Sequence, residues 1–148
     1  MEKKMEKKIK HLEMIEAIIE RMAKNSLQLK EWTMALVVLI ATITAQSGNE
    51  NFVLFGFVPI IGFWFLDSFY LLQERRYKAL YKNVTKKEED KIDFNLDTNV
   101  DVNGEGRNKN EKLCIFNCLF STSEILFYPI IAISLTILFI VLKILNKK

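Results

Sequence analysis

The sequence predicts an all-α membrane protein: a long two-helix transmembrane hairpin that extends into a cytoplasmic coiled-coil-like stem, plus a third, C-terminal transmembrane helix. Three apolar blocks indicate this fold, at residues 27–46, 52–72 and 125–145, and polar or charged segments separate them. A helix needs roughly 17 to 25 apolar residues to cross a hydrocarbon core. A soluble domain of 148 residues would distribute its apolar residues more evenly.

The first element is an amphipathic helix over residues 1–26, which we expect to continue into the first span because no Gly or Pro intervenes. Its apolar residues recur at helical spacing, at Met5, Ile9, Leu12, Ile15, Ile19 and Met22. A membrane-surface helix is the competing interpretation. Interleaved acids and bases favour packing against a partner helix instead. His11 falls on the polar side, where we expect it to be solvated.

The connector over residues 46–51, QSGNEN, contains a glycine, Gly48, and Asn residues that suit a tight turn, and it lacks Lys and Arg. The nearby positive charges lie in residues 1–30 and 75–82, at the other ends of the two spans. The positive-inside rule therefore predicts a cytoplasmic N-terminus in the bacterial inner membrane, with the turn outside.

Folding the two helices about Gly48 places Lys30 at the depth of Asp67, so we expect an intramembrane charge pair between them. An unpaired charge there costs roughly 2.5 to 3.5 kcal/mol on insertion scales. Because ionisable residues at membrane depth also mark functional sites, Asp67 is in addition a candidate gate residue. The expected aromatic surroundings of Asp67 are Phe63, Trp64, Phe65, Phe69 and Tyr70. The expected stripe of the stem that faces the first helix is Leu66, Tyr70, Tyr77, Leu80 and Val84.

Further candidate positions lie along the hairpin. The candidate pore or packing positions are Thr42, Thr44, Gly56, Pro59 and Gly62. Glycine permits close helix approach and proline bends a helix, although membrane helices also tolerate both without a special role. The candidate cytoplasmic docking or gating face is Gln73, Glu74, Arg75, Arg76 and Tyr77.

The chain divides into three regions. Residues 1–84 form the hairpin with its stem, residues 85–112 a polar cytoplasmic loop, and residues 113–148 a short interfacial helix and the third span. The loop is too hydrophilic to pack alone, yet its segment IDFNLDT alternates polar and apolar residues, so docking on the stem is a second interpretation. A start signal at Ser121–Ser123 with Glu124 precedes the third span, which places the C-terminus outside if it crosses.

The sequence carries no motif for catalysis, cofactor binding or metal binding. It contains one histidine, and no Gly-rich phosphate loop, HExxH motif or nucleophile elbow. Cys114 and Cys118 have no nearby His or further Cys to complete a zinc site. We therefore expect a non-enzymatic protein whose partners are the lipid bilayer and further copies of itself. A cytoplasmic protein at the stem is a candidate partner, and nucleic acid is not.

The segment FWFLDSFYLLQERRYKALYKNV follows a helix EAIIERMAKNSLQLKEW and precedes IDFNLDT and a final apolar span. In these features the chain resembles a widespread group of small uncharacterised bacterial membrane proteins, over nearly its whole length. In layout it is also similar to the SLATT-type two-transmembrane effectors of nucleotide-signalling defence systems, a resemblance that implies oligomerisation and perforation of the inner membrane. The third span and the lack of a sensor domain depart from that second pattern.

These observations lead us to expect an oligomeric, pore-forming or membrane-disrupting effector of a bacterial defence or conflict system. Its path would be lined by polar residues such as Thr42, Thr44 and Asp67. The alternatives are a non-catalytic membrane anchor or scaffold for a cytoplasmic partner, and a small transporter component.

Overall fold

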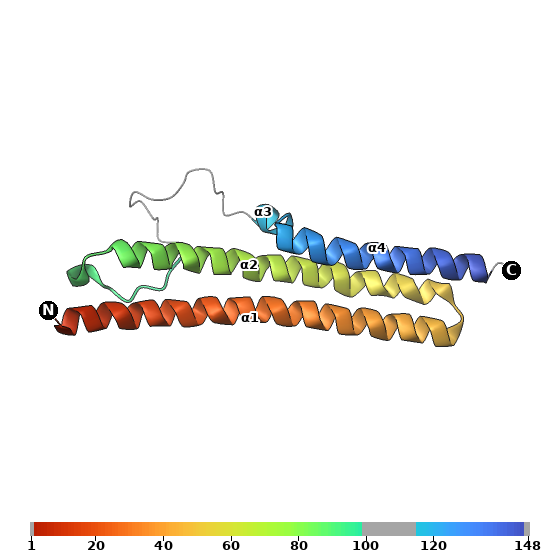
Figure 1. Cartoon of the computed structure of the whole chain (residues 1–148), viewed down its shortest axis with the longest axis horizontal. Helices are drawn as coiled ribbons and strands as arrows, with labels where there is room; N and C mark the ends of the chain where they lie inside the picture. The colour runs from red at the N-terminus through yellow and green to blue at the C-terminus, as the bar shows by residue number, and fades with distance from the viewer. Residues whose placement is uncertain (1, 99–114, 147–148) are drawn as a thin grey trace.

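The computed structural model describes residues 2–98 and 115–146, and these residues form helices without any strand (Figure 1). The long helices are α1 (Glu2–Ser47), α2 (Phe57–Lys86) and α4 (Thr122–Leu145). Short elements connect or flank them: the 3-10 helices η1 (Glu50–Gly56) and η2 (Glu89–Lys91), and the helix α3 (Ile115–Leu119). The predicted all-α class is confirmed.

The hairpin turns at Gly48. This residue has a φ of 66°, a left-handed conformation that glycine adopts without strain, and it directly follows the end of α1. The side chain of Asn49 then accepts a hydrogen bond from the Asn51 N–H at 3.1 Å, which caps η1. The predicted second helix therefore begins with a 3-10 segment. Pro59 lies in the first turn of α2, where a missing N–H removes no helical hydrogen bond, so it is not a kink within the span.

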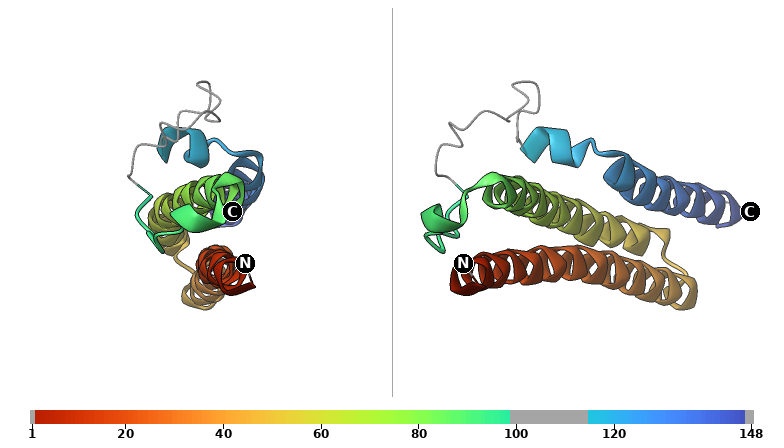
Figure 2. Two further views of the ribbon diagram at one scale, coloured as in Figure 1. Left: turned by 90° about the vertical axis from the view of Figure 1, so that its left-hand side faces the viewer. Right: turned by 60° about the vertical axis from the view of Figure 1, so that its left-hand side comes forward.

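The three long helices lie side by side, with α2 between α1 and α4 (Figures 1 and 2). The N-terminal end of α1 and the hairpin turn are at opposite ends of the molecule, and α4 runs toward the turn. There the Asn146 side-chain amide donates hydrogen bonds to the Gly48 carbonyl at 3.0 Å and to the Glu50 carboxylate at 2.7 Å. The core between η1, α2 and α4 consists of Val53, Ile60, Tyr128, Ile131 and Leu135.

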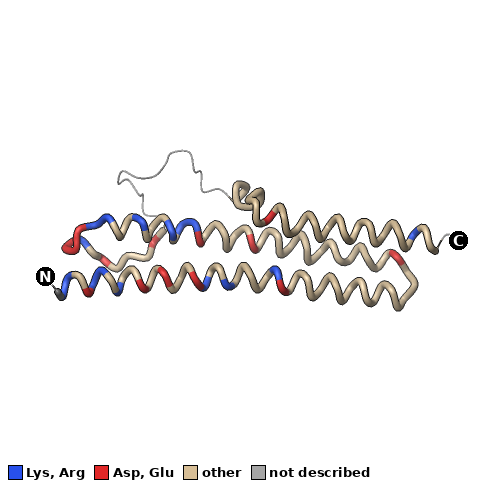
Figure 3. Tube along the Cα trace, in the orientation of Figure 1, with Lys and Arg blue, Asp and Glu red and all other residues tan. Residues whose placement is uncertain are grey.

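Within residues 2–98 and 115–146, three helical stretches are long and apolar enough to cross a membrane, at Lys3–Ser47, Glu50–Lys86 and Thr122–Leu145. Charged residues gather at the end of the molecule that holds the N-terminus, and the other end is almost free of them (Figure 3). Large apolar side chains such as Leu39, Val58 and Ile137 are more than half exposed on the outside of this uncharged end. A lipid-facing surface requires such an apolar exterior.

The first part of the predicted loop, residues 87–98, packs against α1, which agrees with the second interpretation of this segment and not with a flexible loop. Lys8 Nζ donates to the carbonyl oxygens of Thr85 at 3.0 Å and Lys87 at 2.8 Å. His11 Nε2 lies 3.2 Å from the Asn95 carbonyl oxygen, and the His11 ring lies 5.4 Å from that of Phe94. We call residues 87–98 the strap. Residues 99–112 of the predicted loop, and Cys114, lie outside the described residues.

The strap overturns the expectation for His11. The side chain of His11 is 0% exposed, because the strap covers the helix face that the sequence pattern marks as polar. The predicted facing stripe of α2 is also partly wrong. Val84 is buried, but Leu66 is 41% exposed, and the buried positions near it are Asp67 and Ser68. Successive helix positions differ by about 100°, so turning Asp67 inward directs Leu66 outward.

Candidate functional site

Four side chains from three helices meet in the interior of the bundle. Lys30 of α1 forms an ion pair with Asp67 of α2, and its Nζ lies 3.1 Å from Glu124 Oε1 of α4. Tyr128 of α4 donates a hydrogen bond from its hydroxyl to Asp67 Oδ2 at 3.0 Å. We call these four residues the Lys30 cluster. The predicted pairing of Lys30 with Asp67 is present in the structure, and it is one half of a larger arrangement.

Local structure explains why these side chains meet. Lys30 and Asp67 lie at nearly equal distances along the chain from the Gly48 turn, so two antiparallel helices place them at the same level. Glu124 and Tyr128 are four residues apart in α4 and therefore share one face. Two hydrogen bonds from α2 hold the segment that leads into α4. The Arg75 guanidinium donates to Ser121 Oγ at 3.0 Å, and Trp64 Nε1 donates to the carbonyl of Leu119, the last residue of α3, at 3.2 Å.

The cluster lies at one edge of the uncharged part of the bundle. Residues 32–49, 51–66 and 125–142 contain no Asp, Glu, Lys or Arg. Asp67 directly follows the stretch 51–66, and Glu124 directly precedes the stretch 125–142. Glu31 directly precedes the stretch 32–49, and Lys30 is the residue before Glu31. If the uncharged stretches span the bilayer, the cluster lies at the boundary of the hydrocarbon core nearest the N-terminal end of the molecule.

The charges of the cluster are almost completely removed from solvent. Asp67 and Glu124 are 0% and 1% exposed, and the Lys30 side chain is 16% exposed. One ammonium therefore serves two carboxylates, which gives a net charge of −1 when all three groups are ionised. Asp67 Oδ1 and Glu124 Oε2 are buried without a hydrogen-bond partner among the described residues. A buried carboxylate oxygen without a partner is costly, so this arrangement is electrostatically incomplete.

Two aromatic rings of α4 lie close to the ammonium. The Lys30 Nζ lies 5.9 Å from the centre of the Phe127 ring and 6.0 Å from that of Tyr128, within range of a cation–π interaction. The Trp64 ring stacks on Tyr128 at 6.0 Å. The predicted aromatic surroundings of Asp67 are thus only partly right. Phe65 and Phe69 are exposed on the outside of α2, and α4 supplies the rings instead.

The candidate pore or packing positions are dispersed over the bundle. Thr44 and Gly56 are buried, Pro59 is half-buried, and Thr42 and Gly62 are exposed. The structure thus does not align them along one polar path. At Gly56 a methyl group would lie 2.7 Å from Leu135 Cδ1, whereas at Gly62 it would meet nothing within 4 Å. Only Gly56 is therefore required for close approach of η1 and α4.

The candidate docking or gating face lies in α2 just beyond the cluster. Its residues are all half-buried: Gln73, Glu74, Arg75, Arg76 and Tyr77. Arg75 binds Ser121 at the start of α4, and Glu74 forms an ion pair with Lys78 one turn away in its own helix. This segment therefore connects the stem to α4, and Arg75 is engaged within the chain.

Glu124 and Tyr128 are the site residues that sequence reasoning missed. An acid at the edge of an apolar span is a recognisable signal, because ionisable residues at membrane depth are costly unless paired. The pattern around Glu124 in the sequence predicts only a helix start. Among the described residues no group of three or more His, Cys, Asp and Glu side chains is arranged to hold a metal ion.

No protein-family model, no curated protein and no solved structure matches this chain.

Proposed function

We propose that the protein is an oligomeric effector of the bacterial inner membrane that acts in a defence or conflict system and permeabilises the membrane when α4 separates from the α1–α2 hairpin. The observation that supports this proposal is the Lys30 cluster. It links all three membrane-length helices through charged groups at one level of the bundle.

In the resting arrangement the bundle is closed. The charged groups of the cluster contact one another, and the outer surface of the uncharged part is apolar. Thr42 faces outward and donates its hydroxyl hydrogen to the Val38 carbonyl of its own helix at 2.8 Å, so it offers little to a water-filled path. We therefore assign the lining of the path to the Lys30 cluster, in place of the threonines expected from sequence.

Separation of α4 would leave Glu124 without Lys30 and Asp67 without the Tyr128 hydroxyl, whereas Lys30 and Asp67 stay paired within the hairpin. Charged groups at membrane depth must then find water or groups of opposite charge. In an assembly of several copies, these side chains turn toward a shared hydrated path, and the apolar faces of the helices remain in contact with lipid. The energetic cost of unpaired charge in one chain thereby becomes the driving force for a pore among several chains.

The signal for this change enters at the stem. The strap and the N-terminal part of α1 form the charged end of the molecule, and Arg75 connects α2 to the first residue before α4. A cytoplasmic partner that moves the stem part of α2 therefore acts on the start of α4 through the Arg75–Ser121 hydrogen bond.

The test is a variant that releases α4 without a signal. Glu124→Lys places a second ammonium beside Lys30 in a buried site, and like charges at this distance repel strongly in a medium of low dielectric constant. Glu31→Lys is the matched control, because it makes the same charge change next to Lys30 on an exposed side chain. Cells that express Glu124→Lys should lose their membrane potential, as reported by a potential-sensitive dye, and cells that express Glu31→Lys should keep it. An unchanged potential with Glu124→Lys present in the membrane would contradict the proposal.

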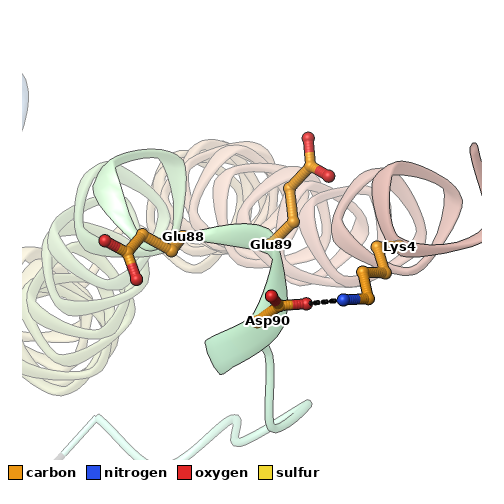
Figure 4. A pocket seen from close by; sticks show the side chains of 4 residues that line it. All are labelled: Lys4, Glu88, Glu89 and Asp90. Carbon is orange, nitrogen blue, oxygen red and sulfur yellow. Dashed lines mark ion pairs between the residues drawn. The ribbon is translucent and has the colours of Figure 1, made fainter. Parts of the chain in front are cut away.

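A membrane anchor for a cytoplasmic partner is the second candidate function. An open hollow at the charged end supports it, lined by Lys4, Glu88, Glu89 and Asp90 (Figure 4). Lys4 and Asp90 form an ion pair across the hollow, and Glu88 and Glu89 point away from that pair. Purification in detergent separates the two functions. A closed homo-oligomer favours the pore, and a monomer that retains a cytoplasmic protein favours the anchor.

A further inference from the structure

The charge balance of the Lys30 cluster is incomplete by one positive charge. The groups that face Glu124 come from each helix packed against it: Lys30 from α1, Asp67 from α2, and Tyr128 from α4 itself. Arg75 of α2, a further cation that contacts the segment before α4, donates its hydrogen bond to Ser121 Oγ. Among the described residues, Lys30 is the only cation in an ion pair with either carboxylate.

The unused oxygens show where the missing charge can bind. Asp67 Oδ2 accepts hydrogen bonds from Lys30 and Tyr128, and Glu124 Oε1 accepts one from Lys30. The second oxygen of each carboxyl group is buried and has no hydrogen-bond partner in the part of the chain that the structure describes. Two carboxylates that share one cation in an apolar site repel each other, and a proton on either of them removes this repulsion. The cluster then consists of one ammonium, one carboxylate and one carboxylic acid, and is neutral.

We propose that the Lys30 cluster is a proton-binding site, in which Asp67 and Glu124 together hold one proton taken from water at the stem side of the bundle. Binding changes the charge of the cluster from −1 to 0, and no covalent bond other than the O–H bond forms or breaks. Water reaches the cluster at Lys30, whose side chain is the only partly exposed charge in it. Loss of the proton leaves a net charge in the apolar interior and weakens the attachment of α4. This effect on the pore rests on the proposed function, whereas the bound proton does not.

Infrared spectroscopy of the purified protein in detergent tests the proton directly, because the C=O stretch of a carboxylic acid is separate from the bands of carboxylates and shifts in D2O. The wild type at neutral pH should show one buried carboxylic-acid band. Both Glu124→Gln and Asp67→Asn should lose it, since the remaining carboxylate pairs with Lys30 alone. Glu31→Gln, an exposed acid next to Lys30, should retain it. If Asp67→Asn does not fold, loss of the band in Glu124→Gln is sufficient, and its persistence there overturns the proposal.

Two further outcomes would overturn the proposal. One is a wild-type spectrum without the band. The other is a thermal stability that rises with sodium chloride but not with choline chloride in the absence of the band, which would assign the two oxygens to a sodium ion. The two proposals can fail separately. If the wild type shows the band but Glu124→Lys does not depolarise cells, the proton-binding site stands and the pore is rejected. If Glu124→Lys depolarises cells but the wild type lacks the band, the pore stands and the proton-binding site is rejected.

Discussion

Removal of the ammonium from the Lys30 cluster should destabilise the protein strongly. Lys30→Met leaves Asp67 and Glu124 buried, at 0% and 1% exposure, without the cation that both contact. Breaking a buried ion pair by removal of one partner costs about 3 to 5 kcal/mol. We therefore expect the free energy of unfolding to fall by about that amount.

The structure also predicts how the loss is recovered. In Lys30→Met/Asp67→Asn one buried carboxyl group remains without a cation, so we expect recovery of only about half of the loss. Adding Glu124→Gln should recover most of the rest, because the three positions then carry no charge. Unfolding in detergent, followed by tryptophan fluorescence at pH 8, gives this order. Lys24→Met, on an exposed lysine of the same helix, should remain close to the wild type. A triple variant no more stable than Lys30→Met would refute the reasoning. Full recovery of stability in the double variant would show that Glu124 does not depend on Lys30.

Three further predictions concern packing and the strap. Gly56→Val should lower the free energy of unfolding by about 1 to 3 kcal/mol, because the new side chain overlaps a buried leucine in α4, whereas Gly62→Val, with open space around it, should change stability much less. His11→Ala should cost about 1 kcal/mol through loss of the hydrogen bond to the strap, and should make the strap more sensitive to limited proteolysis. At Asp93, partial burial raises the pKa, but a backbone hydrogen bond and the Lys87 ammonium outweigh it, so the pKa lies below the usual 3.8. The contribution of Asp93 to strap docking is thus present above the usual pKa and is lost as the pH falls through the lowered one. Lys87→Met should raise the pKa of Asp93 toward its usual value in an NMR titration.

The hairpin could be predicted from sequence because its geometry depends on local signals. An uninterrupted helical pattern, a single glycine turn and equal chain lengths on both sides were enough to place Lys30 opposite Asp67. The position of α4 beside the hairpin depends on contacts that no repeating pattern in the sequence indicates. Residues 87–121 connect α2 to α4, and their number does not fix the level at which α4 lies beside the hairpin. Counting residues along the chain therefore could not place Glu124 and Tyr128 beside Lys30 and Asp67.

His11 shows the same limit at the other end of the molecule. Of the predicted apolar stripe, Ile15 is buried but Met5 and Ile9 are about half exposed, and the helical pattern contains no information about a later segment that covers His11. The strap has no helical period and a single alternating stretch, so its contact with α1 depends on individual hydrogen bonds from Lys8 and His11. Individual contacts of this kind leave no repeating signal in a sequence.

The most direct test of the central claim is to fix α4 on the hairpin with a disulfide. Gly56→Cys and Leu135→Cys would join η1 to α4, where a methyl group on Gly56 would lie 2.7 Å from Leu135 Cδ1, and would be introduced together with Glu124→Lys in a chain whose Cys114 and Cys118 are replaced by serine. Proteoliposomes loaded with potassium would report permeation. We predict no potassium release in the oxidised protein, and release after reduction of the disulfide. Equal release in the two states would show that separation of α4 is not the step that opens the membrane.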